Sequence, residues 1–210
     1  MSTEPIRPLH DVWLRPRRVF RELAERPVGR VDWILAAAQG VVEVLEFFRT
    51  RNVGAGNSLS QIFGSAVLVG SVVGIASLYI MTAIYSRVAA LSGNPPVPRR
   101  LIHVLAYSGV PMAAALAIWI VVALLAGETA FTTPLKPNVE GFVVILLQAQ
   151  FCSYVFLLIW SVVLQVMGFS EILGIATRKA FGIWVLGQLV SVLAALFLMI
   201  LIATLFPGAA

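Results

Sequence analysis

Five long runs of apolar residues alternate along this chain with short segments rich in glycine, proline and charged residues. Within each run Val, Leu, Ile, Ala and Phe follow one another without a polar residue at every second position, which indicates helices and not alternating strands. About 20 helical residues cross a hydrocarbon core about 30 Å thick, where a helix satisfies its own backbone hydrogen bonds. The predicted spans are residues 31–50, 62–86, 101–126, 139–167 and 181–206.

Composition strengthens this interpretation. Hydrophobic residues make up 60% of the 210 residues, mean hydropathy is +0.93, and only 12% of residues are charged. A soluble domain of this length could not bury so much apolar surface, and no connecting segment is long enough for a second domain. The sequence therefore predicts an all-α polytopic membrane protein. It consists of a basic cytoplasmic arm at residues 1–30 and a bundle of five transmembrane helices at residues 31–210.

The basic residues are divided unequally between the two sides of the predicted spans. Twelve of the fifteen Lys and Arg residues precede the first span, follow the second or follow the fourth; the other three are Arg49, Arg51 and Lys136. Because basic loops stay in the cytoplasm during insertion, we expect a cytoplasmic N-terminus and a periplasmic C-terminus in the cell inner membrane. This bias also explains the net charge of +5, and no nucleic-acid partner is predicted.

The basic arm contains one amphipathic segment. Pro16 suits a first helical turn, after which Val19, Phe20 and Leu23 fall on one face. Such a helix lies in the membrane interface, with its apolar face toward acyl chains and its arginines toward anionic headgroups. The alternative is a juxtamembrane segment whose arginines only set topology. The candidate lipid contacts are Arg15, Arg17, Arg18 and Arg21.

A polar stripe runs along the first predicted span. One helical face carries residues spaced by four, three, four, three and four positions, namely Asp32, Ala36, Gln39, Glu43, Glu46 and Thr50, and Arg49 lies one turn beyond Glu46. An acid near the middle of a span, as Glu43 is, costs several kcal/mol (about 2.5–3.5 on insertion scales) and should face protein or water. The stripe is either a functional polar site for a proton, a cation or a headgroup, or a structural hydrogen-bonded network. Glu46 and Arg49 are expected to form a local pair near the outer interface.

The third span contains a predicted kink. Pro111 lacks an N–H and clashes with the carbonyl one turn back, so the helix should bend near Tyr107, where Ser108 can help satisfy the freed backbone oxygens. His103, one turn before Tyr107, could form a polar cavity there that opens to the cytoplasm. The alternative is a structural kink packed against a neighbouring helix. If Glu43 faces the kink, the two features form one intramembrane site.

Two glycines at the spacing GxxxG, Gly70 and Gly74, lie in the second span, where they permit close helix packing within the chain or at a dimer face. Polar residues of the later spans, such as Gln150 and Gln188, are expected to hydrogen-bond across helices. The two histidines, His10 and His103, are far apart, and no nucleotide-binding, nucleophile or metal-ligand motif is present. The sequence predicts no enzyme, no cofactor and no metal.

Three segments carry a resemblance to a known family. They are residues 13–20 (WLRPRRVF) of the arm, residues 105–111 (LAYSGVP) in the third span, and residues 166–171 (VMGFSE) with the later Arg178-Lys179-Ala180. In these segments the chain resembles the bacterial branch of the Yip family, the Ypt/Rab-interacting integral-membrane proteins. The resemblance implies five spans and a cytoplasmic N-terminus. Eukaryotic relatives act with Rab GTPases in vesicle traffic, but a bacterium has no such Rab cycle, so that partner is not carried over.

Two functions follow as hypotheses. The first is a non-enzymatic scaffold or adaptor that organises membrane lipids or a partner membrane protein, a second copy of the chain included. The second is a small transporter or channel for an ion, a proton or a lipid, which would use the stripe of Glu43 and Glu46. A transporter should lose flux when Glu43 becomes Gln, whereas a scaffold should co-purify with lipid or protein in a way that depends on the arm.

Overall fold

The computed structural model describes residues 7–132 and 141–205, and within these ranges every regular element is a helix. In chain order the elements are α1 Pro8–Asp11, α2 Pro16–Leu23, α3 Arg30–Thr50, η1 Val53–Ala55, α4 Leu59–Leu91, α5 Pro98–Ser108, α6 Val110–Ala126, η2 Gly127–Phe131, α7 Gly141–Leu173 and α8 Thr177–Leu205. All five apolar runs are therefore helical over their described residues. The third run is divided into α5 and α6 at Gly109.

Local sequence accounts for several helix ends. Ser58 caps α4, because its Oγ accepts from the Gln61 backbone N–H and the Gln61 side chain accepts from the Ser58 N–H. Pro16 and Pro98 stand at the first positions of α2 and α5, where a missing N–H costs nothing. Gly93, in the turn after α4, has a φ of +78°, a conformation that residues with a Cβ rarely adopt.

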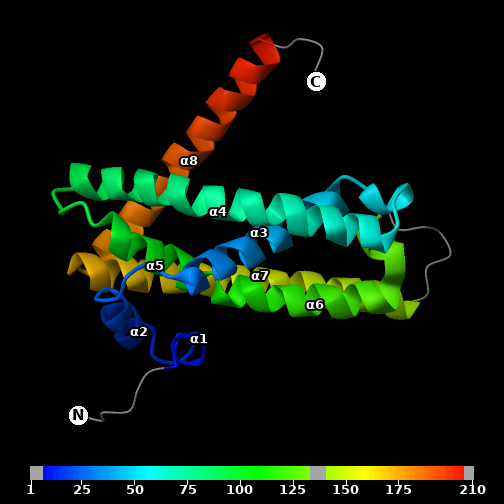
Figure 1. Cartoon of the computed structure of the whole chain (residues 1–210), viewed down its shortest axis with the longest axis horizontal. Helices are drawn as coiled ribbons and strands as arrows, with labels where there is room; N and C mark the ends of the chain where they lie inside the picture. The colour runs from blue at the N-terminus through cyan, green and yellow to red at the C-terminus, as the bar shows by residue number, and fades with distance from the viewer. Residues whose placement is uncertain (1–6, 133–140, 206–210) are drawn as a thin grey trace.

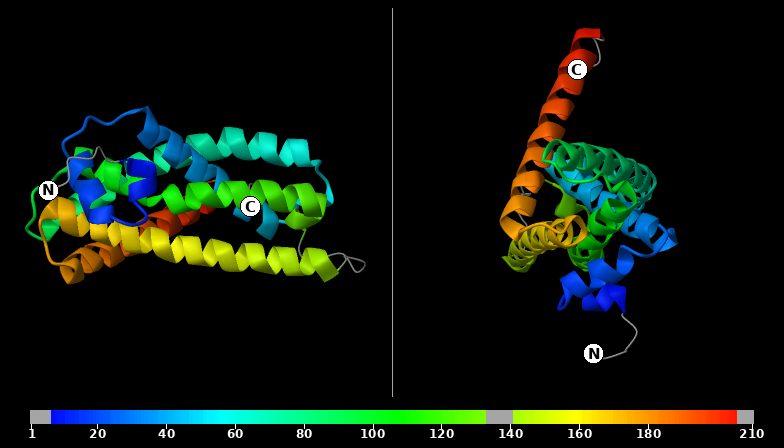
Figure 2. Two further views of the ribbon diagram at one scale, coloured as in Figure 1. Left: turned by 90° about the horizontal axis from the view of Figure 1, so that it is seen from below. Right: turned by 90° about the vertical axis from the view of Figure 1, so that its left-hand side faces the viewer.

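Long helices dominate the architecture (Figure 1). α6 and α7 run alongside one another, and α3 packs between α4 and α6. α8 contacts α4 and α7 near its start and then points away from the other helices (Figures 1 and 2). The short helix α2 lies at the end of the bundle where α4 and α7 end and where α5 and α8 begin.

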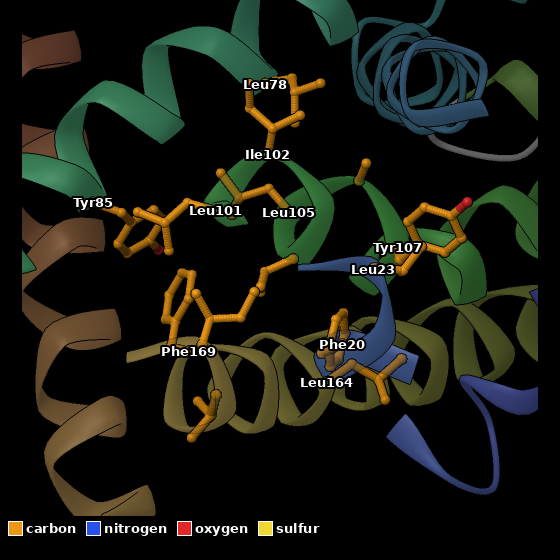
Figure 3. Close-up of a cluster of buried hydrophobic side chains, with 14 of the residues drawn as sticks. Phe20, Leu23, Leu78, Tyr85, Leu101, Ile102, Leu105, Tyr107, Leu164 and Phe169 are labelled. Carbon is orange, nitrogen blue, oxygen red and sulfur yellow. The ribbon is translucent and has the colours of Figure 1, made fainter. Parts of the chain in front are cut away.

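Two clusters of buried apolar side chains fill the interior. One lies at the α2 end and contains Phe20, Tyr85, Leu164 and Phe169, and part of it is shown in Figure 3. The other lies toward η2, where the ring of Trp119 stacks on that of Phe131 with centroids 5.0 Å apart. The arm is thus part of the interior at one end, whereas the 3-10 turns close the other.

Within the described residues, four helical segments are long and apolar enough to cross a membrane. They are 59–91, 98–131, 141–173 and 177–197. α3 is not among them, because Asp32, Glu43, Glu46 and Arg49 interrupt its apolar residues. The expectation of five transmembrane helices is confirmed for these four segments and as an all-helical fold, while a fifth span at α3 is not confirmed.

The glycine pair of the second span lies against α3 of the same chain. A Cβ placed on Gly70 would come within 2.6 Å of the Val41 backbone, and one on Gly74 would overlap the backbone of Ala36 and Gly40. Gly40 in turn would meet the backbone of both α4 glycines. The two helices therefore touch backbone to backbone, which gains van der Waals contact without a hydrophobic driving force. This surface is used within the chain and is not free for a dimer.

Candidate functional site

The arm helix α2 is docked on the bundle through its apolar face. Val19, Phe20 and Leu23 are at most 2% exposed, and α2 packs against α7 and α5. Gly168 of α7 permits this approach, because a Cβ there would crowd Phe20 and Val104. The expectation that this face would meet acyl chains is therefore wrong. The ends of α5 and α7 supply a closer-packed apolar surface than lipid does (Figure 3).

Docking fixes the arginines of the arm on the outside. Arg15, Arg17 and Arg21 are exposed and Arg18 is half-buried. The Nε of Arg21 donates to the Glu171 carboxylate at 2.7 Å, and this carboxylate raises the pKa of the Arg21 guanidinium. Arg17 donates to the Thr177 hydroxyl at 3.1 Å, and Arg18 pairs with Glu22 within the same helix. The arm is thus tied by polar contacts to the last turn of α7 and to the first residue of α8.

Further exposed basic residues lie near these arginines at the same end of the bundle. They lie near the end of α4, at the start of α5 and at the start of α8: Arg87, Arg99, Arg100, Arg178 and Lys179. Arg26, between α2 and α3, and Arg30, the first residue of α3, are also exposed. We call the exposed arginines and the lysine of this end the basic platform. Its charges come from four separate parts of the chain, so only the folded protein presents them together.

A polar cavity of about 270 Å³ lies between α3, α4, α5, α7 and α8. Its polar lining comes from α3 (Gln39 and Glu43), α4 (Ser77), α7 (Gln165) and α8 (Gln188). The Nε2 of Gln39 donates to the Glu43 carboxylate at 3.3 Å. The Gln39 amide also touches Gly109, where α5 gives way to α6. Gln39 thus joins Glu43 to the break in the third span, which Ser108 and Pro111 flank on either side.

Glu46 and Arg49 form a second polar group, apart from this cavity. Arg49 pairs with Glu46 at 3.0 Å, and the Gln150 amide of α7 donates to the same carboxyl group at 2.8 Å. The predicted stripe is therefore divided. Gln39 and Glu43 face the cavity, whereas Glu46 and Arg49 bridge α3 to α7. Their residue spacing indicated a common face but contained no information on which neighbouring helix covers each part of it.

His103 is placed with Asp32 and not with Glu43. Its Nδ1 is 2.7 Å from the Asp32 carboxylate and its Nε2 is 3.1 Å from the Arg26 carbonyl, and the His103 and Asp32 side chains are only 3–4% exposed. Asp32 also accepts from the Gly29 backbone N–H at 2.8 Å. This cluster joins the start of α3 to α5. Asp32 was predicted on the polar stripe but not as a residue of the candidate site, because its partner is 71 residues away and no local pattern connects the two.

At the break in the third span the Ser108 hydroxyl donates to the Leu105 carbonyl at 3.1 Å, so it satisfies a backbone oxygen of its own helix. Tyr107 is 6% exposed and belongs to the apolar cluster shown in Figure 3. It does not line the polar cavity. The break therefore contributes to the cavity through Leu105 and through the contact of Gly109 with Gln39.

Docking of the arm predicts a clear effect for Phe20→Ala. The ring is fully buried, and its removal leaves a hole that the rigid helices around it cannot close. We expect the arm to detach more often and trypsin to cleave at its arginines roughly ten times faster or more, because cleavage follows the population of the open form. Leu14→Ala is the control, since Leu14 is 75% exposed. Equal cleavage rates for the two variants would contradict the docking described above.

Comparisons with known proteins identify a family. The sequence profile of the Yip1 domain matches residues 11–203, which includes the arm helix, the cavity and the basic platform. No curated protein and no solved structure matches the chain. Among the residues that the structure describes, no group of three or more His, Cys, Asp or Glu side chains could hold a metal ion.

Proposed function

The chain belongs to the Yip1 domain family, and from this premise we propose that it is a non-enzymatic scaffold or adaptor, which organises anionic lipids or partner proteins at the membrane surface. Its membrane-capable helices and its family make it an integral membrane protein. We further propose that α3 completes a bundle of five spans. The basic platform then faces the cytoplasm and the C-terminus lies outside the inner membrane, as the basic-residue bias favours.

The observation that carries this proposal is the docked arm. A free basic arm would have to be ordered when it binds, whereas the docked helix already holds its arginines in place. The apolar face of the arm helix is buried, whereas Arg15 and Arg17 are exposed to the outside. Arg99 and Arg178 add positive charge from two other helices. Anionic headgroups or an acidic protein surface would meet this platform without rearrangement of the chain.

The test is the retention of anionic lipid. We expect the wild-type protein, purified from a mixture of phosphatidylglycerol and phosphatidylcholine, to keep phosphatidylglycerol selectively in native mass spectrometry. Arg15→Gln with Arg17→Gln should weaken this selectivity about fivefold for each arginine, because a basic residue near an anionic surface contributes on the order of 1 kcal/mol. The preference should also fall as salt is raised, because exposed charges are screened.

Arg51→Gln is the matched control for this experiment. It removes one positive charge, as each arm substitution does by itself, but from the loop that follows α3, at the other end of that helix, so its effect is compared with that of a single arm substitution. We expect it to leave lipid selectivity unchanged. Equal losses for the arm and control variants would mean that net charge alone attracts the lipid, and an unchanged arm variant would overturn the lipid-organising role.

A second candidate function has its own supporting observation. The polar cavity places Glu43 against long apolar helices, as a transporter for an ion, a proton or a lipid would require. Glu46 does not contribute to this candidate site, because it is paired with Arg49 and Gln150. In reconstituted vesicles, Glu43→Gln would then abolish flux while the protein stays folded. The scaffold role is instead tested by the arm variants.

A further inference from the structure

We propose that the polar cavity binds an amphiphilic organic cation, that is, a protonated amine on an apolar body, with the Glu43 carboxylate as its counter-charge. This inference goes beyond the scaffold function and rests on residues that the basic platform does not use. It names a ligand class for the cavity, and it holds whether or not the ligand is then moved across the membrane.

The first support is unused hydrogen-bonding capacity in the cavity wall. The Ser77 hydroxyl and the Gln188 amide make no hydrogen bond within the described part of the chain. The Gln165 oxygen accepts from the Trp184 indole N–H at 2.8 Å, which leaves the NH₂ of that amide without a partner among the described residues. Polar groups inside a membrane domain are costly unless they are satisfied, so a ligand or water that bonds to them is favourable.

The second support is the sign of the charge. Glu43 is the one ionisable side chain among the residues that line the cavity, and no basic residue lines it. The nearest basic residue along α3, Arg49, is paired with Glu46. An anionic ligand would therefore be repelled and left unpaired in a region of low dielectric constant, whereas a cation would neutralise the carboxylate. The Gln39 amide, which donates to Glu43, holds the carboxylate in place for this contact.

The third support is the size and the apolar part of the cavity. A volume of about 270 Å³ is several times the roughly 30 Å³ that one water occupies, and it approaches the lower end of organic-ligand pockets. Leu78, Met81 and Leu105 form an apolar part of the cavity wall. Methionine adapts its shape to different apolar partners. A bare metal ion would leave this wall unused, whereas the chain of an alkylamine would cover it.

The fourth support is access from the bilayer. The Glu43 side chain is exposed and Gln188 is half-exposed, so the cavity opens to the outside at these two residues. Gln188 lies on α8, which runs away from the other helices toward its C-terminal end (Figures 1 and 2). An amphiphile dissolved in the membrane can therefore enter the cavity laterally from the bilayer. Its amine would reach Glu43, and its apolar chain would lie against the apolar side chains of α8.

The experiment uses three ligands of equal chain length: n-octylammonium, n-octanol and n-octanoate. Each is titrated into the full chain in mild detergent at pH 7, and binding is followed by isothermal titration calorimetry and by thermal shift. We expect saturable binding of octylammonium, with weaker binding of octanol and none of octanoate. Glu43→Gln should weaken octylammonium binding at least tenfold and bring it to the level of octanol.

Two further variants make the result decisive. Glu128→Gln removes a carboxylate from η2, outside the cavity, and should bind octylammonium as the wild type does. Ser77→Leu keeps Glu43 but fills the cavity, and should abolish binding of octylammonium and octanol alike. If Glu43→Gln does not fold, as judged by circular dichroism and gel filtration, Ser77→Leu decides between the outcomes.

Two results would overturn the proposal. Equal binding of all three ligands would show simple partitioning of alkyl chains onto apolar helices, and undiminished binding by Glu43→Gln or Ser77→Leu would place the ligand elsewhere. Retention of phosphatidylglycerol is measured on the same preparations. Because that retention depends on the arm arginines, it should be unchanged in Glu43→Gln, so failure of the cavity proposal and failure of the scaffold proposal give different patterns.

Discussion

Replacement of Asp32 by alanine is expected to lower the free energy of unfolding by about 4 kcal/mol. Loss of one partner of a buried ion pair leaves the other group in a site of low dielectric constant, which commonly costs about 3–5 kcal/mol. Both nitrogens of His103 face oxygen acceptors, the Asp32 carboxylate and the Arg26 carbonyl, so both hydrogen bonds are made only when the ring carries two protons. Without Asp32 this cation would be buried without a counter-charge.

Equilibrium unfolding in detergent, followed by circular dichroism, measures this effect. The double variant Asp32→Ala with His103→Leu should recover part of the loss, because an apolar pair avoids the cost of an uncompensated charge. Glu22→Ala is the control. It breaks the pair with Arg18, which is about one-third exposed, and should change the free energy of unfolding by less than about 0.5 kcal/mol. If Asp32→Ala were equally mild, the buried pair would not stabilise the start of α3.

Replacement of Gly74 by leucine is expected to lower the free energy of unfolding by about 3 kcal/mol. Insertion of extra atoms into a well-packed contact typically costs about 1–3 kcal/mol, and here the upper end is expected because the atoms in the way are backbone. A Cβ at this position would overlap Ala36 and Gly40 of α3. The two helices would have to separate along their length, and the contact between α3 and α4 would be lost.

Gly64→Leu is a matched control on the same helix. A Cβ at Gly64 meets no atom within 4 Å, so the same substitution there should be neutral or slightly stabilising, because leucine favours a helix over glycine. Thermal unfolding of the two variants side by side gives the comparison. A similar melting temperature for both would mean that α3 and α4 do not depend on close backbone contact.

The family and the positions of the membrane helices were predictable from the sequence. Apolar runs such as those of α4 and α7 predict membrane helices without knowledge of the tertiary structure. Each helix satisfies its backbone hydrogen bonds within its own segment and does not depend on a distant one. The Yip family resemblance rests on short segments in the right order, and the profile match over residues 11–203 confirms it. α3 is the exception: its periodicity predicted the helix, but its charged residues leave its role as a span unconfirmed.

The candidate site was predictable only in part. Helical spacing placed Gln39, Glu43 and Glu46 on one face. It could not show that Gln150 donates a hydrogen bond to Glu46, whereas Gln39 and Glu43 face a cavity. In the same way, amphipathicity identified Phe20 as part of a face that would be covered, and lipid was the wrong expectation for what covers it. A hydrophobic pattern indicates that a surface is shielded from water, but it does not indicate whether lipid or another helix shields it.

By itself, then, the sequence determined the helices, the charge bias and the family of this protein, because each follows from the types and order of residues along the chain and requires no knowledge of which segments are in contact. The tertiary structure alone decided the partners: Asp32 with His103, Gln150 with Glu46, and the arm with α5 and α7. These contacts join residues 71 to more than 100 positions apart. Which polar groups meet is set by helix packing, where backbone contact at Gly40, Gly70 and Gly74 fixes how α3 lies against α4.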